Sequence, residues 1–122
     1  MKNIALLILF CSYCAVSFSQ ESKNVSTSIA LLTSFQKNEY EKATSDFDET
    51  MKNALPATKL KFVWEDLNTK CGKFLNYSTI TEGKIQTYDV TYILCHFEKV
   101  NLKMKVVFND KNQVAGLFFV PE

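Results

Sequence analysis

The sequence predicts an α+β domain in which about three N-terminal helices pack on a four-stranded antiparallel meander. Hydrophobic residues recur with helical spacing as far as Gly72 and alternate with a period of two after it. The connections between the expected strands are short, so neighbouring strands in the sequence should pair with each other. Helices that precede strands in this way are typical of a sheet with its helices on one face.

The first three expected elements are amphipathic helices. The first covers residues 25–35, and the second covers 38–55, with Asn38 as its N-cap and an acid three residues later. Pro56 ends the second helix or opens the third. The third centres on residues 60–67 and should stop at Gly72. The acids of the second stretch suit a solvated outer surface, namely Glu39, Glu41, Asp46, Asp48 and Glu49.

The last four expected elements are strands rich in β-branched and aromatic residues. They cover residues 74–81, 86–99, 102–108 and 114–120, with turns at 82–84, 100–101 and 109–112. A two-residue turn at Val100-Asn101 would pair Lys99 with Leu102. That register turns one set toward the helices: Thr91, Ile93, Cys95, Phe97, Leu102, Met104, Val106 and Phe108. The opposite face receives Tyr88, Val90, Tyr92, Leu94 and His96, and a one-residue slip would exchange the two sets.

Residues 1–19 have the pattern of a secretory signal peptide. Lys2 precedes an apolar run, and Ser17 and Ser19 supply the small residues of a cleavage site. Cleavage after Ser19 leaves residues 20–122 as one domain with equal numbers of Lys and acidic residues. The apolar run is shorter than the ~20 residues of a spanning helix, so we expect no stable membrane anchor. The chain is then exported, to a bacterial periplasm or out of the cell.

Four cysteines divide between this segment and the domain. Cys11 and Cys14 fall inside the expected signal peptide, so their C-x-x-C spacing carries no redox or metal assignment. Cys71 and Cys95 could pair in an exported protein, which would stabilise it by roughly 3–4 kcal/mol. The alternative is two buried thiols that behave as small hydrophobic side chains.

The composition excludes several function classes. The chain has 122 residues, a formal net charge of +1 and no Arg, so it has no basic face for nucleic acid and no bidentate phosphate ligand. Its three glycines form neither a P-loop nor a G-x-S-x-G turn. His96 is the single histidine, and adjacent Cys95 must point to the opposite face of a strand. We therefore expect no catalytic triad, no metal site and no cofactor.

Several segments of the chain resemble one known family. They are Trp64-Glu-Asp-Leu67, Gly72-Lys-Phe74 and Val114-Ala-Gly116-Leu117, together with Phe35, Tyr40, Ala43, Phe47 and Leu55. The pattern resembles the domain of unknown function 3887 family from about Ile29 to Val120. That family is similar to the nuclear transport factor two-like, cystatin-like architecture, which implies a curved sheet wrapped around helices as a cone. Some members precede an α/β-hydrolase domain, and the family supplies no catalytic residues to transfer.

Two surfaces follow as candidate sites. The cone interior would hold a small apolar ligand or be filled by its own core, and its residues would be Phe35, Phe47, Trp64, Ile93, Phe97, Met104 and Phe108. The opposite face of the sheet is unusually apolar, which is typical of an interface. A homodimer would use Tyr88, Val90, Tyr92 and Leu94 there, although strand propensity alone could also place them.

The leading functional hypothesis is an exported binding module for a small apolar molecule or a protein. One alternative is a small acid–base enzyme of ketosteroid-isomerase type, with Asp89 and a Tyr as its candidates. Another is an accessory partner of a separately encoded α/β-hydrolase, which the resemblance implies.

Overall fold

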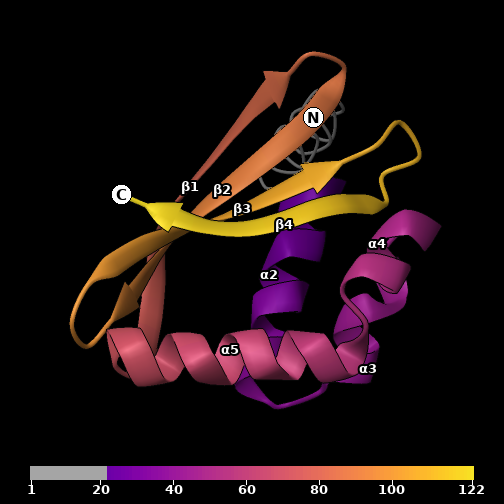
Figure 1. The fold of residues 1–122 in the computed structure, drawn as a ribbon. Coiled ribbons are helices and arrows are strands. Elements are labelled where there is room, and N and C mark those ends of the chain that lie inside the picture. The colour runs from indigo at the N-terminus through magenta and orange to yellow at the C-terminus, as the bar shows by residue number, and fades with distance from the viewer. Residues whose placement is uncertain (1–21) are drawn as a thin grey trace, which may run out of the picture.

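The computed structural model describes residues 22–122, and in it helices cover one face of a four-stranded antiparallel sheet (Figure 1). The helical part comprises α2 (Lys23–Gln36), α3 (Tyr40–Ala43), the 3₁₀ turn η1 (Thr44–Asp46), α4 (Glu49–Ala54) and α5 (Ala57–Cys71). The sheet has the order β1 (Phe74–Ile85), β2 (Tyr88–Phe97), β3 (Asn101–Phe108) and β4 (Val114–Pro121). The predicted α+β class is therefore confirmed. The expected signal peptide, with Cys11 and Cys14, lies outside the described residues.

The first and third predicted helices form where their hydrophobic spacing places them. Ser22 caps α2 because its Oγ accepts a hydrogen bond from the Val25 N–H at 3.1 Å. Gly72 ends α5 with a φ of 84°, a conformation that favours glycine. In Figure 1, α2 stands against the sheet and α5 crosses its lower end. No helix among residues 22–122 has the length and hydrophobicity needed to cross a bilayer.

The second predicted helix is wrong as a continuous element. Residues 38–55 form α3, η1 and α4 instead, because Phe47 adopts an extended conformation and makes a parallel bridge with Val114 of β4. The N–H of Asp48 donates to the Val114 carbonyl at 2.9 Å, and the Asp48 carboxylate then caps α4. Asn38 is not the expected N-cap: its φ is 60°, and no side chain caps α3.

The hairpin between β2 and β3 differs from the predicted two-residue turn. Cys95 pairs with Leu102, which shifts the register by four residues from the expected one. The reason is that both the backbone and the side chain of Glu98 form hydrogen bonds with Lys73. The Glu98 N–H donates to the Lys73 carbonyl at 3.0 Å, and the Glu98 carboxylate accepts from the Lys73 N–H at 2.8 Å. Because four is an even number, the shift leaves each side chain on its predicted face.

The first strand is longer than predicted. β1 continues through residues 82–84, and the turn falls at residues 86–87, where Gln86 has a φ of 57°. Two register shifts interrupt the pairing of β1 with β2, the second between Tyr77 and Ile80. Ser78 and Thr79 therefore both lie opposite Leu94, as in a β-bulge.

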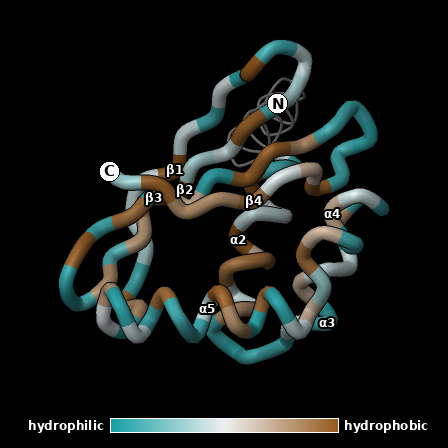
Figure 2. The backbone as a smooth tube through the Cα atoms, viewed as in Figure 1, coloured by the Kyte–Doolittle hydropathy of each residue, from teal (hydrophilic) through white to brown (hydrophobic). Residues whose placement is uncertain are grey.

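The core lies between the helices and the inner face of the sheet. Its cluster includes all seven expected interior residues: Phe35, Phe47, Trp64, Ile93, Phe97, Met104 and Phe108. Trp64 is central, since its ring centroid lies 5.1 Å from that of Phe35 and 6.0 Å from that of Phe97. Figure 2 shows hydrophobic residues along α2 and the strands, with hydrophilic residues at the loops. The side chains of this cluster fill the space under the sheet.

Both domain cysteines are free thiols in this structure. Cys95 is fully buried in the core, whereas Cys71 is half-buried at the end of α5. Burial raises the pKa of the Cys95 thiol to about 12, although a backbone hydrogen bond at Met104 acts in the opposite direction. Cys95 is therefore protonated and unreactive at neutral pH.

Replacing Gly72 by Ala should lower the free energy of unfolding by about 2 kcal/mol. An added Cβ would lie 2.6 Å from the Glu98 Cβ, and the φ of 84° is strained for any L side chain. Gly83→Ala is the matched control, because nothing lies within 4 Å of its added Cβ. Urea denaturation measures the free energy of unfolding of both variants. Equal losses in the two variants would contradict the requirement for glycine at position 72.

A thiol reagent should separate the two cysteines. In the native protein at neutral pH we expect 5,5′-dithiobis(2-nitrobenzoic acid) to modify Cys71 and to leave Cys95 unmodified, because Cys95 is fully buried. Denaturation without reductant should expose both thiols. Peptide mapping gives the result, and the absence of both modified peptides after denaturation would show that the two cysteines are paired.

Candidate functional site

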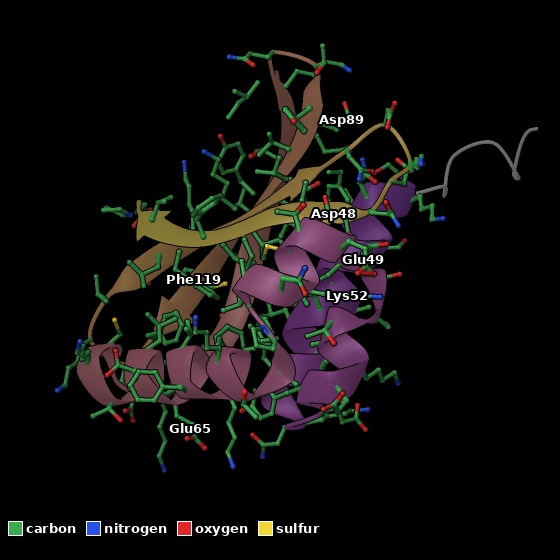
Figure 3. The ribbon with its side chains drawn as sticks, turned by 45° about the vertical axis from the view of Figure 1, so that its right-hand side comes forward. Asp48, Glu49, Lys52, Glu65, Asp89 and Phe119 are labelled. Carbon is green, nitrogen blue, oxygen red and sulfur yellow. The ribbon has the colours of Figure 1, made fainter. Side chains whose placement is uncertain are left out.

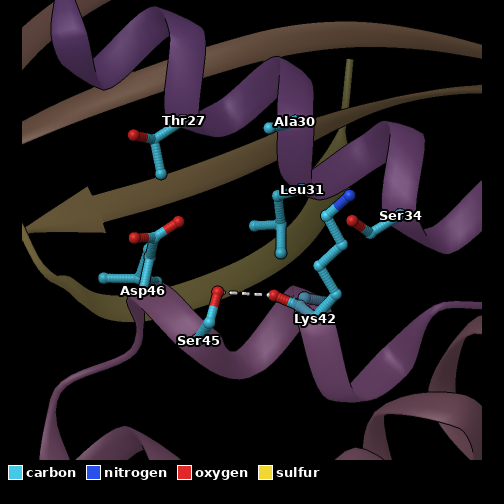
Figure 4. Close-up of a pocket in the computed structure, with 9 residues that line it drawn as sticks. Thr27, Ala30, Leu31, Ser34, Lys42, Ser45 and Asp46 are labelled. Atoms are coloured by element: carbon cyan, nitrogen blue, oxygen red, sulfur yellow. Dashed lines mark hydrogen bonds between the residues drawn. The ribbon is translucent and has the colours of Figure 1, made fainter.

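The seven expected interior residues are buried against one another. Trp64 also lines an open hollow of about 280 Å³ at the edge of the core, with Gln36, Asn68, Lys73 and Phe74. One pocket lies beside the core, between α2 and α3–η1, with Leu31, Ser34, Lys42 and Asp46 among its walls (Figure 4). Its volume is about 80 Å³. Ligand pockets usually measure roughly 300–1,000 Å³, so this one suits a few waters rather than a ligand.

Asp89 does not provide the buried acid of an isomerase-type site. It lies directly opposite Lys84 in the β1–β2 pairing, and its carboxylate is 3.0 Å from the Lys84 ammonium. The Asp89 side chain is 43% exposed. Figure 3 shows it far from α5, whereas Phe119 points into the space between the sheet and that helix. Asp89 is therefore a partly exposed member of a cross-strand ion pair.

The outer face of the sheet, turned away from the helices, carries the exposed apolar surface. Two cross-strand rows form its centre: Tyr92 pairs with Lys105, which pairs with Phe118, and Leu94 pairs with Lys103, which pairs with Val120. We call these six residues the outer face. Phe118 is 51% exposed, and the other five are half-buried.

The residues expected at a dimer face divide between surface and interior. Tyr92 and Leu94 belong to the outer face, and Tyr88 is exposed near the β1–β2 turn. Val90 is buried, with 1% of its surface exposed, so it is not part of the surface in this structure. The apolar surface instead extends across β3 to Phe118 and Val120 of β4.

The two outer-face lysines lie over aromatic rings. The Lys103 ammonium is 5.9 Å from the Tyr92 ring centroid, and the Lys105 ammonium is 5.5 Å from that of Phe118. Such contacts stabilise a cation by about 0.5–1 kcal/mol at exposed sites. Neither lysine joins an ion pair in the part of the chain that the structure describes. The outer face thus presents two cations, set among apolar groups, that lack an acidic partner within residues 22–122.

A row of hydrogen-bonded polar side chains borders the outer face and crosses all four strands. We call it the polar row: Ser78 of β1, His96 of β2, Asn101 of β3 and Glu122 just after β4. Ser78 Oγ lies 2.8 Å from His96 Nε2, and His96 Nδ1 lies 2.9 Å from Asn101 Oδ1. The Asn101 amide nitrogen donates to Glu122 Oε1 at 3.3 Å.

Sequence reasoning placed His96 on the correct face but missed its partners. The pairing of His96 with Asn101 depends on the four-residue register shift, and Ser78 lies at the irregularity of β1. The available signal is the alternation around His96, which places its side chain on the outward face but does not identify its neighbours on the adjacent strands. Within residues 22–122 no three His, Cys, Asp or Glu side chains converge in a way that would hold a metal ion.

Comparisons with known proteins give one family. No curated protein and no solved structure matches the chain. A family model, described as a protein of unknown function (DUF3887), matches residues 28–117, which run from the middle of α2 into β4. The match covers most of the chain and confirms the resemblance drawn from its tryptophan, glycine and core positions. The chain therefore belongs to the DUF3887 family.

Proposed function

We propose that this domain is an exported binding module that engages a protein on the outer face of its sheet. The observation that carries the proposal is the pair of lysines held over Tyr92 and Phe118 without an acidic partner among the described residues. The filled interior favours a protein over a small apolar ligand, because the expected cavity residues contact one another. An accessible apolar surface of this kind is typical of an interface.

The chemistry of the outer face defines its partner. Leu94, Val120 and the rings of Tyr92 and Phe118 would take up apolar side chains, and the two ammonium groups would pair with carboxylates. The proposed partner is therefore a protein segment in which acidic residues lie among apolar ones. A separately encoded α/β-hydrolase with such a segment would satisfy this description.

A second copy of the chain is the other occupant that the sequence suggested. A two-fold dimer through the outer face would bring Lys103 and Lys105 of both copies into one interface. Like charges juxtaposed in an interface cost several kcal/mol. The one carboxylate joined to the polar row, Glu122, lies at the border of the face rather than at its centre. Charge complementarity thus favours an acidic partner over self-association.

Selection of random displayed peptides on the purified protein tests this proposal. We expect the selected peptides to combine Asp or Glu with apolar residues, and to lose at least about tenfold in affinity on the Lys103→Glu, Lys105→Glu double variant. The matched control is Lys59→Glu with Lys61→Glu, which makes the same charge change on the exposed surface of α5. Isothermal titration calorimetry measures the affinities.

Two results would contradict the acidic partner. One is a set of peptides without acidic residues, or peptides that both double variants weaken equally. The other is a stable dimer in analytical ultracentrifugation that dissociates on Phe118→Lys, since that result would assign the outer face to a second copy.

The expected signal peptide can be tested separately from the binding surface. Expression of the full sequence in a bacterium with a general secretion pathway should yield a periplasmic or secreted protein whose N-terminus is Gln20, because Ser17 and Ser19 fit a signal-peptidase site. Intact mass spectrometry measures the N-terminus. A protein that retains Met1 in the cell interior would contradict the signal peptide.

A further inference from the structure

The direction of each hydrogen bond in the polar row follows from Glu122. A carboxylate only accepts, so the Asn101 group that faces it must be the NH₂, which leaves Asn101 Oδ1 facing His96. The amide oxygen also only accepts, so His96 Nδ1 must carry a hydrogen. In a neutral imidazole the lone pair then lies on Nε2, which is 2.8 Å from Ser78 Oγ. Ser78 therefore donates its hydroxyl hydrogen to His96.

This arrangement has the hydrogen-bond pattern of an activated serine, with an amide in place of the usual carboxylate. The Ser78 hydroxyl is hydrogen-bonded to the imidazole base of His96, and Asn101 holds that imidazole in the required tautomer. We propose that Ser78 is an acyl-accepting nucleophile, that His96 is its general base, and that the site acts on small esters. Asn101 is a positioning residue, and Glu122 fixes the orientation of the Asn101 amide.

The reaction balances without a cofactor. Ser78 Oγ bonds to the ester carbonyl carbon while its proton moves to His96 Nε2. The tetrahedral intermediate collapses, the bond to the leaving oxygen breaks, and the proton on Nε2 goes to the departing alcohol. Water then attacks the acyl-serine with His96 again as the base, which releases the acid and restores Ser78.

The surroundings of Ser78 indicate the substrate class. Ser78 is exposed, so an ester can reach it from solvent. The irregularity of β1 places Ser78 opposite Leu94, whose row continues to Lys103 and Val120. A short acyl chain would therefore lie on the apolar outer face, with its alcohol portion toward solvent. Such an open site favours esters with good leaving groups.

Acetylation by p-nitrophenyl acetate, followed by peptide mass spectrometry of the purified protein, tests the proposal. We expect Ser78 to acquire the acetyl group at least about tenfold faster than Ser45, since general-base assistance contributes roughly 10²–10⁴-fold in enzymes. Ser45 is the matched internal control: it is also exposed, but its hydroxyl donates to the Lys42 carbonyl. His96→Gln should abolish the difference, and Asn101→Leu should reduce it.

The Asn101→Asp variant separates the positioning role of Asn101 from a general loss of structure. An aspartate oxygen can still accept a hydrogen bond from His96 Nδ1, so we expect this variant to retain acetylation of Ser78. A second measurement is the rate of iodoacetamide alkylation of Ser78→Cys against Ser45→Cys, which should differ at least fivefold and lose the difference with His96→Gln. Equal acetylation rates of Ser78 and Ser45 would contradict the proposed nucleophile, as would an unchanged Ser78 rate in a folded His96→Gln protein. The polar row would then have a structural role alone. The acetylation rates are measured without any peptide on the unsubstituted outer face, so a failed peptide selection does not alter them and the two proposals fail separately.

Discussion

The arrangement of the sheet depends on the hydrogen bonds between Glu98 and Lys73. They join the residue after β2 to the residue before β1, and the Lys99 N–H adds a bond to the Cys71 carbonyl at 2.9 Å. Gly72 makes this approach possible, because the Glu98 Cβ occupies the space that a side chain there would need. The end of α5 is thereby fixed to the β2–β3 turn, and the turn in turn fixes which residues of the two strands pair. The opposition of Tyr92 to Lys105 and of His96 to Asn101 follows from that register.

Sequence patterns predicted the features that depend on local periodicity. The alternation of Leu102, Met104, Val106 and Phe108 identified the inner face correctly even though the hairpin register was wrong, because an even shift preserves the faces. The stop at Gly72 also follows from local chemistry. The break at Phe47 could not be predicted, because it arises from a bridge to Val114, which is remote in the sequence. A helical spacing of hydrophobic residues persists through residues 38–55 and does not reveal that contact.

The candidate site could be predicted only in part, because local alternation assigns faces but does not reveal which residues pair across strands. Tyr92 and Leu94 were placed on the outward face by alternation, but the lysines over the aromatic rings require the partner strands in register. Predicting the polar row would also require the position of the register shift in β1, because Ser78 lies at that shift. Large side chains fill the interior, whereas the sheet surface carries the two lysines without a described ion pair and the polar row. Both proposals therefore concern neighbouring regions of one surface.

The irregular pairing of β1 has a consequence for solubility. β1 is an end strand of the sheet, and a long, regular end strand would offer its free backbone groups to other chains. The two register shifts interrupt that edge, and Glu82 and Lys84 add charges near its far end. An irregular and charged edge is a poor template for strand addition, which disfavours aggregation of this sheet into larger ones. The irregularity beside which Ser78 meets His96 thus also protects this edge of the sheet.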